Sequence, residues 1–229
     1  MTASSFIALF DLDHTLLPLD SDYQWADFLA RTGRVGDPAE AIRLNEDLME
    51  RYNQGLLTAE ESAEFMLGLL TNASQEELLA WQDEFMQAVI LPSISSAARE
   101  LLAQHQDQGH LVAIVTATNE FITRPIAKAF GVNELIATNL AREEGGWITG
   151  EIAGTPSFRE GKVARVEQWL AERQLGWDGV ESTFYSDSMN DVPLLEKVDH
   201  PVATNPDPRL RALAQERGWR ILDLFPGHP

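Results

Sequence analysis

Two carboxylates follow directly on an apolar run near the start of the chain. The run Phe6–Phe10 leads into Asp11, and Asp13 comes two positions later. Alternation along an extended chain puts these two side chains on the same side, and α/β sheets bind ligands beyond the carboxyl ends of their strands. Two close acids are costly when partly buried unless a cation or a shared proton relieves them. Taken alone, the pair is better explained as a helix cap or as solvated loop acids than as a functional site.

Two further strand ends favour a site. The apolar run Leu111–Val115 ends in Thr116, and Thr183–Ser186 ends in Asp187, which begins "DSMND". Lys162 opens the helical segment "GKVARVEQWL" between them. Singly, each polar residue has an ordinary structural explanation, such as a strand end, a cap or an exposed helical lysine. Those explanations do not account for the convergence of acids, a hydroxyl and a lysine on one predicted sheet edge.

Phosphoryl transfer through an aspartyl-phosphate needs this set of groups. Asp11 is anionic at pH 7 and attacks phosphorus without a base to activate it. Mg²⁺ prefers oxygen ligands and would bind Asp11, Asp187, a backbone carbonyl and the phosphate. Lys162 adds positive charge, and Thr116 donates a hydrogen bond to a phosphoryl oxygen. Asp13 protonates the leaving alkoxide and later deprotonates the attacking water, which explains why the acids come as a pair.

The four motifs together resemble the haloacid dehalogenase superfamily, in its phosphoserine-phosphatase-like branch. They are "DLDHT" at 11–15, Thr116 after "LVAIV", Lys162, and "SDSMND" at 186–191. The resemblance implies a phosphoric monoester hydrolase with a Rossmann-like core and a helical cap inserted after the first motif. By position it implies a nucleophile, Asp11; an acid–base residue, Asp13; phosphate binders Thr116, Ala117 and Lys162; Mg²⁺ ligands Asp11, Asp187 and the Asp13 carbonyl; and supporting residues Asn190 and Asp191.

The elements that must position these residues are those of an α/β fold. Short apolar runs flanked by helical stretches predict a parallel sheet buried on both faces. Residues 18–90 contain no strand candidate and are predicted to form an all-helical cap, with 1–17 and 91–229 as the Rossmann-like core. The remaining strand candidates are Leu135–Asn139, Val198–Ala203 and Trp147–Ile152, the last as a hairpin with Leu135–Ala141. Capping-box patterns predict four cap helices, at Ser21/Gln24, Asp37-Pro38/Glu40, Thr58/Glu61 and Ser74/Glu77.

The sequence departs from the phosphoserine-hydrolysing relatives at two places. Those relatives commonly have Ser-Gly-Gly where this chain has Thr116-Ala117-Thr118, and a cap arginine that binds the substrate carboxylate. No arginine occurs in 52–98, and an ungapped alignment puts Glu64 at that place. Asp20 falls where the branch has a cap-facing acid able to bind an amine. The sequence therefore predicts an amino-alcohol phosphate such as histidinol phosphate, or a neutral alcohol phosphate, rather than phosphoserine. Asp20 and Glu64 themselves fit solvated helix acids better than substrate contacts, since charged residues are usually exposed.

Composition narrows the function further. The chain of 229 residues carries a formal net charge of −19, which disfavours nucleic acid and anionic membranes as partners and suits a small phosphate ester bound with Mg²⁺. With no cysteine, thiol chemistry is excluded and a cytoplasmic location is expected. Asp13 argues against halide displacement, and the lack of any lysine before Lys128 argues against phosphonate cleavage through a Schiff base. A phosphomutase and a non-catalytic phospho-binding regulatory protein remain as alternatives.

Overall fold

The chain folds into two compact units. The computed structural model describes residues 5–53, 56 and 59–225. The core unit comprises Met1–Leu19, Ser93–Asn139 and Gly154–Pro229, and the helical unit comprises Asp20–Pro92 and Leu140–Ala153.

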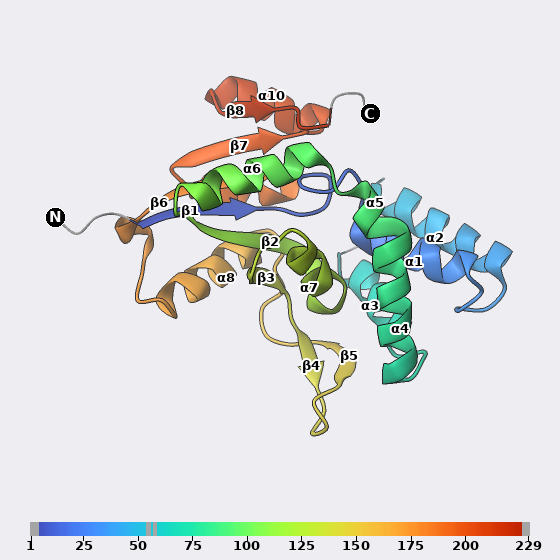
Figure 1. Cartoon of the computed structure of the whole chain (residues 1–229). Helices are drawn as coiled ribbons and strands as arrows, with labels where there is room; N and C mark the ends of the chain where they lie inside the picture. Colours follow the sequence, from blue (N-terminus) through green and yellow to red (C-terminus); the bar gives the residue numbers. More distant parts are fainter. Residues whose placement is uncertain (1–4, 54–55, 57–58, 226–229) are drawn as a thin grey trace. The chain divides into compact units, whose positions relative to one another are not determined.

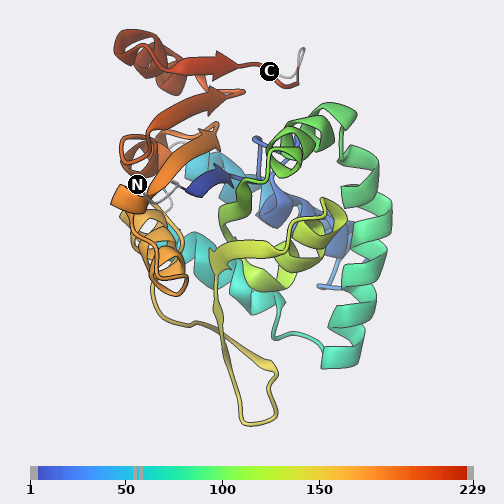
Figure 2. The same ribbon diagram turned by 60° about the vertical axis from the view of Figure 1, so that its left-hand side comes forward.

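The core unit is built on a six-stranded sheet in the order β3-β2-β1-β6-β7-β8, in which every neighbouring pair is parallel (Figures 1 and 2). Since all six strands run the same way, their carboxyl ends meet at one edge of the sheet. The strands are β1 (Ser5–Phe10), β2 (Leu111–Asn119), β3 (Glu134–Thr138), β6 (Val180–Ser186), β7 (His200–Thr204) and β8 (Arg220–Leu222).

Helices cover this sheet on both faces. One face carries a core in which Ile7, Leu9 and Phe184 pack against helix residues such as Trp169 and Leu194. On the other face, His105 of α6 contacts the rings of Phe10 and Tyr185. The helical segments of the core unit are α6 (Ser96–Asp107), α7 (Glu120–Ala129), α8 (Glu160–Ala171), α9 (Val192–Leu195), α10 (Pro208–Arg217) and two 3₁₀ turns, Trp177–Gly179 and Met189–Asp191. The three-residue α5 (Leu91–Ser93) lies where the two units meet along the chain.

The predicted fold class, a Rossmann-like parallel sheet flanked by helices, is confirmed. Five predicted strands correspond to β1, β2, β3, β6 and β7, with ends that differ by a few residues. The strand β8 was missed, because three residues, "RIL", are too short to give a periodic pattern.

The helical unit contains α1 to α4, which are held by a small aromatic core. Trp25 of α1 packs edge-on against Phe85 of α4, with 5.3 Å between ring centroids. A π-helical turn (Met86–Ile90) continues the last helix. The helices are α1 (Ser21–Arg31), α2 (Pro38–Asn53), α3 (Ala59–Leu69) and α4 (Gln75–Phe85).

Local capping explains where most of these helices begin. Ser74 and Glu77 form the predicted capping box of α4, and Asp37 accepts hydrogen bonds from backbone N–H groups of the first turn of α2. The prediction for α1 was wrong by one residue, because the cap is Asp20, which accepts from the N–H of Tyr23 at 2.8 Å. The predicted cap Thr58 lies outside the described residues.

A β-hairpin belongs to the helical unit although the sequence assigned all of 91–229 to the core. Strands β4 (Leu140–Arg142) and β5 (Ile148–Ile152) pair antiparallel, and β5 contacts α3. At Gly150, with φ +82°, an added Cβ would lie 2.4 Å from Thr71 Cγ2, so only glycine allows this close approach. The predicted hairpin partner 135–141 was therefore only partly right, since Glu134–Thr138 pairs with β2 instead.

No helix in the described part of the chain is both long and apolar enough to cross a membrane.

Candidate active site

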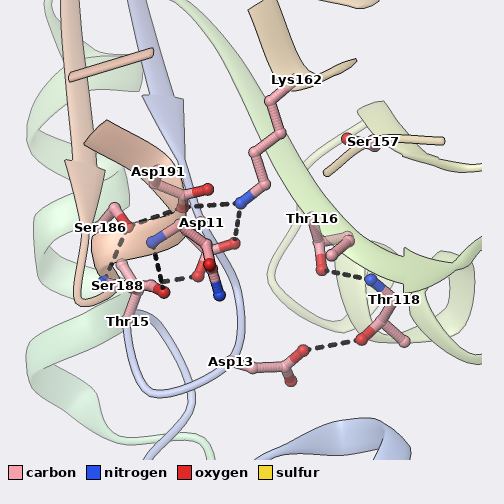
Figure 3. A network of polar contacts seen from close by, with 12 residues as sticks. Asp11, Asp13, Thr15, Thr116, Thr118, Ser157, Lys162, Ser186, Ser188 and Asp191 are labelled. Carbon is pink, nitrogen blue, oxygen red and sulfur yellow. Dashed lines mark hydrogen bonds and ion pairs between the residues drawn. The ribbon is translucent and has the colours of Figure 1, made fainter. Parts of the chain in front are cut away.

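A buried lysine joins two of the predicted acids at the carboxyl edge of the sheet. Asp11 follows β1 directly, and its N–H donates to the carbonyl of Tyr185 on the neighbouring strand at 2.9 Å. Lys162 Nζ lies 2.7 Å from Asp11 Oδ1 and 2.7 Å from Asp191 Oδ2 (Figure 3). Lys162 is only 3 % exposed, so it reaches these carboxylates from inside the core unit. The fold thus brings Lys162 into direct contact with Asp11, 151 positions away, and with Asp191, 29 positions away.

The backbone before Lys162 has an unusual conformation where α8 begins. An added Cβ at Gly161 would lie 2.1 Å from the carbonyl oxygen of Pro156, so the first turn of α8 reaches this carbonyl only because residue 161 is glycine. Arg159, which precedes α8, has φ +51° and ψ −122°, a region that non-glycine residues rarely adopt. Backbone strain of this kind concentrates at functional sites, where surrounding contacts hold it.

A threonine hydroxyl lies between the acids of the first and last motifs. Thr15 Oγ1 donates to Asp187 Oδ1 at 3.1 Å and lies 3.4 Å from Asp11 Oδ2. The same oxygen accepts from the N–H of Asp187 at 3.1 Å, which fixes the loop after β6 against the loop after β1. Asp191 is held in turn by the hydroxyl of Ser186 at 2.7 Å (Figure 3).

The charges in this cluster do not balance. Burial raises the pKa of Asp11 above its ordinary value despite the nearby Lys162 ammonium. Burial, then repulsion from Asp11 and Asp191, raises the pKa of Asp187 well above its ordinary value. Burial raises the pKa of Asp191 to about 6. Burial would lower the pKa of Lys162, but the two carboxylates outweigh it and raise that pKa.

This imbalance fits a site for a cation. The Lys162 ammonium faces the carboxylates of Asp11 and Asp191, whereas Asp187 is repelled by both of these carboxylates, and Asp13 in turn repels Asp11. Among the described residues no group of three or more His, Asp or Glu side chains is arranged to hold a metal ion. The predicted Mg²⁺ ligands are two carboxylates, those of Asp11 and Asp187, and one backbone carbonyl, that of Asp13. Oxygen donors with unneutralised charge are the ligands that Mg²⁺ prefers.

The predicted acid–base residue and phosphate-binding segment lie side by side. Asp13 Oδ2 accepts a hydrogen bond from Thr118 Oγ1 at 2.9 Å, and the hydroxyl of Thr116 accepts from the N–H of Thr118 at 3.2 Å (Figure 3). Thr116 and Thr118 are buried, whereas Ala117 between them is exposed. A hydroxyl that accepts still has one proton to donate, and Thr116 donates it to no residue that the structure describes.

The remaining predicted residues have other contacts. Asn190 Oδ1 accepts from Arg159 Nε at 3.2 Å, whereas Asp191 holds Lys162. In the helical unit, Asp20 caps α1, and Glu64 is an exposed residue of α3.

Sequence reasoning missed several residues that build the site. Thr15 contacts both Asp11 and Asp187, whereas Ser186 holds Asp191, Thr118 holds Asp13 and Arg159 donates to Asn190. Thr15 and Ser186 lie inside the quoted motifs "DLDHT" and "SDSMND", so their position was a usable signal. Nothing in the sequence connects Thr118 to Asp13, because 105 residues separate them.

Comparisons with known proteins identify the family. Residues 8–196 match the family model of haloacid dehalogenase-like hydrolases. Histidinol-phosphatase of Neisseria meningitidis serogroup C (strain 8013) is 43 % identical over 219 residues, which cover 95 % of this chain and 98 % of that protein.

Solved structures extend the comparison. A crystal structure of a protein with unknown function from Bordetella pertussis Tohama I has a TM-score of 0.93 and 63 % identity, and the match covers 97 % of this chain and 100 % of that one. A substrate-bound phosphoserine phosphatase has a TM-score of 0.65 at 18 % identity over 95 % of this chain and 92 % of that one, which shows a shared fold. The chain therefore belongs to the haloacid dehalogenase-like hydrolases and is a phosphatase, a phosphoric monoester hydrolase that acts on small phosphate esters.

Proposed function

We propose that the chain hydrolyses small phosphate monoesters through a phosphoryl group carried on Asp11. The Asp11 carboxylate attacks phosphorus, and the bond to the leaving oxygen breaks as Asp13 donates a proton to it. Asp13 then takes a proton from water, which attacks the aspartyl-phosphate, so that inorganic phosphate leaves, Asp11 is restored as a carboxylate and Asp13 as a protonated acid. Contact of Asp11 with the buried Lys162 ammonium supports this role, because it holds the carboxylate in one orientation.

Two groups of residues would bind the phosphate. The Thr116 hydroxyl and the Ala117 N–H are proposed to donate to phosphoryl oxygens, and Lys162 offsets part of the negative charge. Asp11, Asp187 and the Asp13 carbonyl are proposed to hold Mg²⁺, with Asn190 and Asp191 as supporting residues. When bound, Mg²⁺ would neutralise the surplus carboxylate charge and let an anionic phosphate approach an anionic nucleophile.

The proposed substrate is histidinol phosphate or another amino-alcohol phosphate. The observation that carries this choice is the 43 % identity with a histidinol-phosphatase over almost the full length of both chains. The absence of arginine from residues 52–98 supports it, because the phosphoserine-hydrolysing relatives have their carboxylate-binding arginine in the corresponding segment. A buried carboxylate without a cationic partner costs several kcal/mol, which disfavours phosphoserine. An ammonium group would pair with Asp20 or Glu64 instead.

The experiment is a comparison of kcat/KM across histidinol phosphate, phosphoethanolamine, glycerol phosphate and L-phosphoserine with Mg²⁺. We expect the amine esters without a carboxylate to be the best substrates and phosphoserine to be weak. If phosphoserine proves best, the substrate assignment is wrong and an arginine outside 52–98 must bind the carboxylate.

Two substitutions test the acids of the helical unit. Asp20→Asn removes a charge but keeps the cap of α1, because asparagine caps helices as well as aspartate does. Glu64→Gln removes the charge on α3. Both are expected to lower kcat/KM for amine esters but not for glycerol phosphate. The matched controls are Asp37→Asn, at the cap of α2, and Glu216→Gln on the exposed surface of α10. If neither substitution differs from its control, these acids are ordinary surface charges.

A further inference from the structure

The proposed acid–base residue is held by a hydroxyl from another strand. Thr118 Oγ1 donates to Asp13 Oδ2 at 2.9 Å, and Thr118 is only 4 % exposed. A hydrogen bond to a carboxylate from a buried hydroxyl is shorter and stronger than one between neutral groups. The contact therefore restricts how the Asp13 carboxyl group rotates.

An irregularity in β2 puts this hydroxyl in place. Val115 pairs with Ile136, but the next pair joins Asn119 to Thr138, so four steps along β2 match two along β3. The extra residues form a bulge whose Ala117 carbonyl accepts from the Thr138 hydroxyl at 2.7 Å. Thr138 is itself held, since its oxygen accepts from the N–H of Ser157 at 3.1 Å. Bulges of this kind re-aim side chains next to active sites.

The bulge presents two hydroxyls with different partners. Thr116 and Thr118 alternate with the exposed Ala117 and share a buried side, where the N–H of Thr118 donates to Thr116 Oγ1. Thr116 is thereby placed to act on the phosphate, and Thr118 acts on Asp13. In the Ser-Gly-Gly pattern the position of Thr118 is a glycine, which carries no hydroxyl.

We propose that Thr118 is a positioning residue for proton transfer: it holds Asp13 Oδ2 as an acceptor and so assigns the transferable proton to Oδ1. A protonated carboxyl group accepts on its carbonyl oxygen and donates from the other. Oδ1 thus gives its proton to the leaving oxygen as the P–O bond breaks, and takes one from the attacking water afterwards. This inference rests on the proposed function, in which Asp13 is the acid–base residue.

The test is a leaving-group comparison on Thr118→Val, which keeps the shape of the side chain and removes the hydroxyl. The probes are 4-nitrophenyl phosphate, whose leaving group needs little protonation, and the best alkyl ester of the substrate panel. We expect kcat/KM for the alkyl ester to fall by about 10- to 100-fold, and for 4-nitrophenyl phosphate by less than about 3-fold. Thr118→Ser retains the hydroxyl and is expected to stay within about 3-fold of the wild type on both probes.

A double-mutant cycle separates positioning from packing. With Asp13→Asn already present, Thr118→Val is expected to lower alkyl-ester turnover by no more than about 2-fold further, since the group it positions is gone. The matched control is Thr123→Val on α7, which removes a buried hydroxyl that donates to the Asn119 carbonyl at 2.9 Å. Its kinetics are expected to match the wild type. If Thr118→Val does not fold, as judged by circular dichroism, Thr118→Ala takes its place.

Three results would overturn the inference: equal losses on both probes, no rescue by serine, or a full further loss in the Asp13→Asn background. A loss in Thr123→Val as large as that in Thr118→Val would also overturn it. The loss of any buried hydroxyl would then lower activity, whether or not that hydroxyl contacts Asp13. Failure of the proposed function looks different. In that case the wild type lacks phosphatase activity, or Asp13→Asn affects alkyl and aryl esters equally, and this inference falls with it.

Discussion

Replacing Lys162 by methionine should destabilise the core unit more than any surface substitution. The ammonium contacts two carboxylates at 2.7 Å, and all three side chains are at least nine-tenths buried. Without it, Asp11 and Asp191 stay buried with no cation between them. Removing one partner of a buried ion pair costs about 3–5 kcal/mol, because the other charge is left uncompensated. For a chain of this length that corresponds to a fall in melting temperature of about 6–20 °C.

The assay is thermal and urea unfolding in EDTA, so that no divalent cation replaces the lysine. Lys197→Met is the matched control, because Lys197 Nζ lies 3.9 Å from Glu167 on the surface with both side chains more than 40 % exposed. Exposed pairs of this kind contribute about 0–1 kcal/mol. The double variant Lys162→Met/Asp191→Asn removes one of the two orphaned charges and should recover about half of the loss.

The charge argument is refuted if Lys162→Met melts within about 2 °C of Lys197→Met. It is also refuted if the double variant is less stable than Lys162→Met alone. Removing an uncompensated buried charge would then not restore stability, so such charges would not be the cause of the loss in Lys162→Met.

Four further outcomes follow from the site and the core. Activity should vanish in EDTA and return with Mg²⁺, and Asp11→Asn should abolish turnover while keeping the fold; turnover that persists in either case contradicts the mechanism. Asp13→Asn should slow alkyl-ester hydrolysis by about 10²–10⁴-fold and affect aryl esters less, as measured by kcat/KM. Burial, then the charges of His110 and Arg220, lowers the pKa of His105 to about 4 from its ordinary value of 6.5. Because the unfolded chain binds this proton first, stability is complete above pH 6.5 and should fall between pH 6.5 and 4, by about 1–2 kcal/mol after allowance for solvent screening. The melting temperature should depend less steeply on pH over this range in His105→Gln than in the wild type. An unchanged pH dependence would contradict the assignment of this effect to His105.

Local patterns determined most of the secondary structure. The runs that became β1, β2, β3, β6 and β7 were recognisable because buried parallel strands are short, apolar and separated by helices. The capping box of Ser74 and Glu77 depends on contacts three residues apart, which a sequence displays directly. The motif acids were identifiable for the same reason, since each follows a recognisable strand and the ends of parallel strands meet at one edge.

Only the tertiary structure decided which of these residues touch. Thr15 joins Asp187 across 172 positions, and Lys162 joins Asp11 across 151. The bulge in β2 that aims Thr118 at Asp13 depends on pairing with β3, and a strand's own sequence does not record its partner's register. The hairpin β4–β5 was misassigned for a related reason. Glu134–Thr138 was drawn into the parallel sheet by β2, and packing against α3 decided to which unit the hairpin belongs.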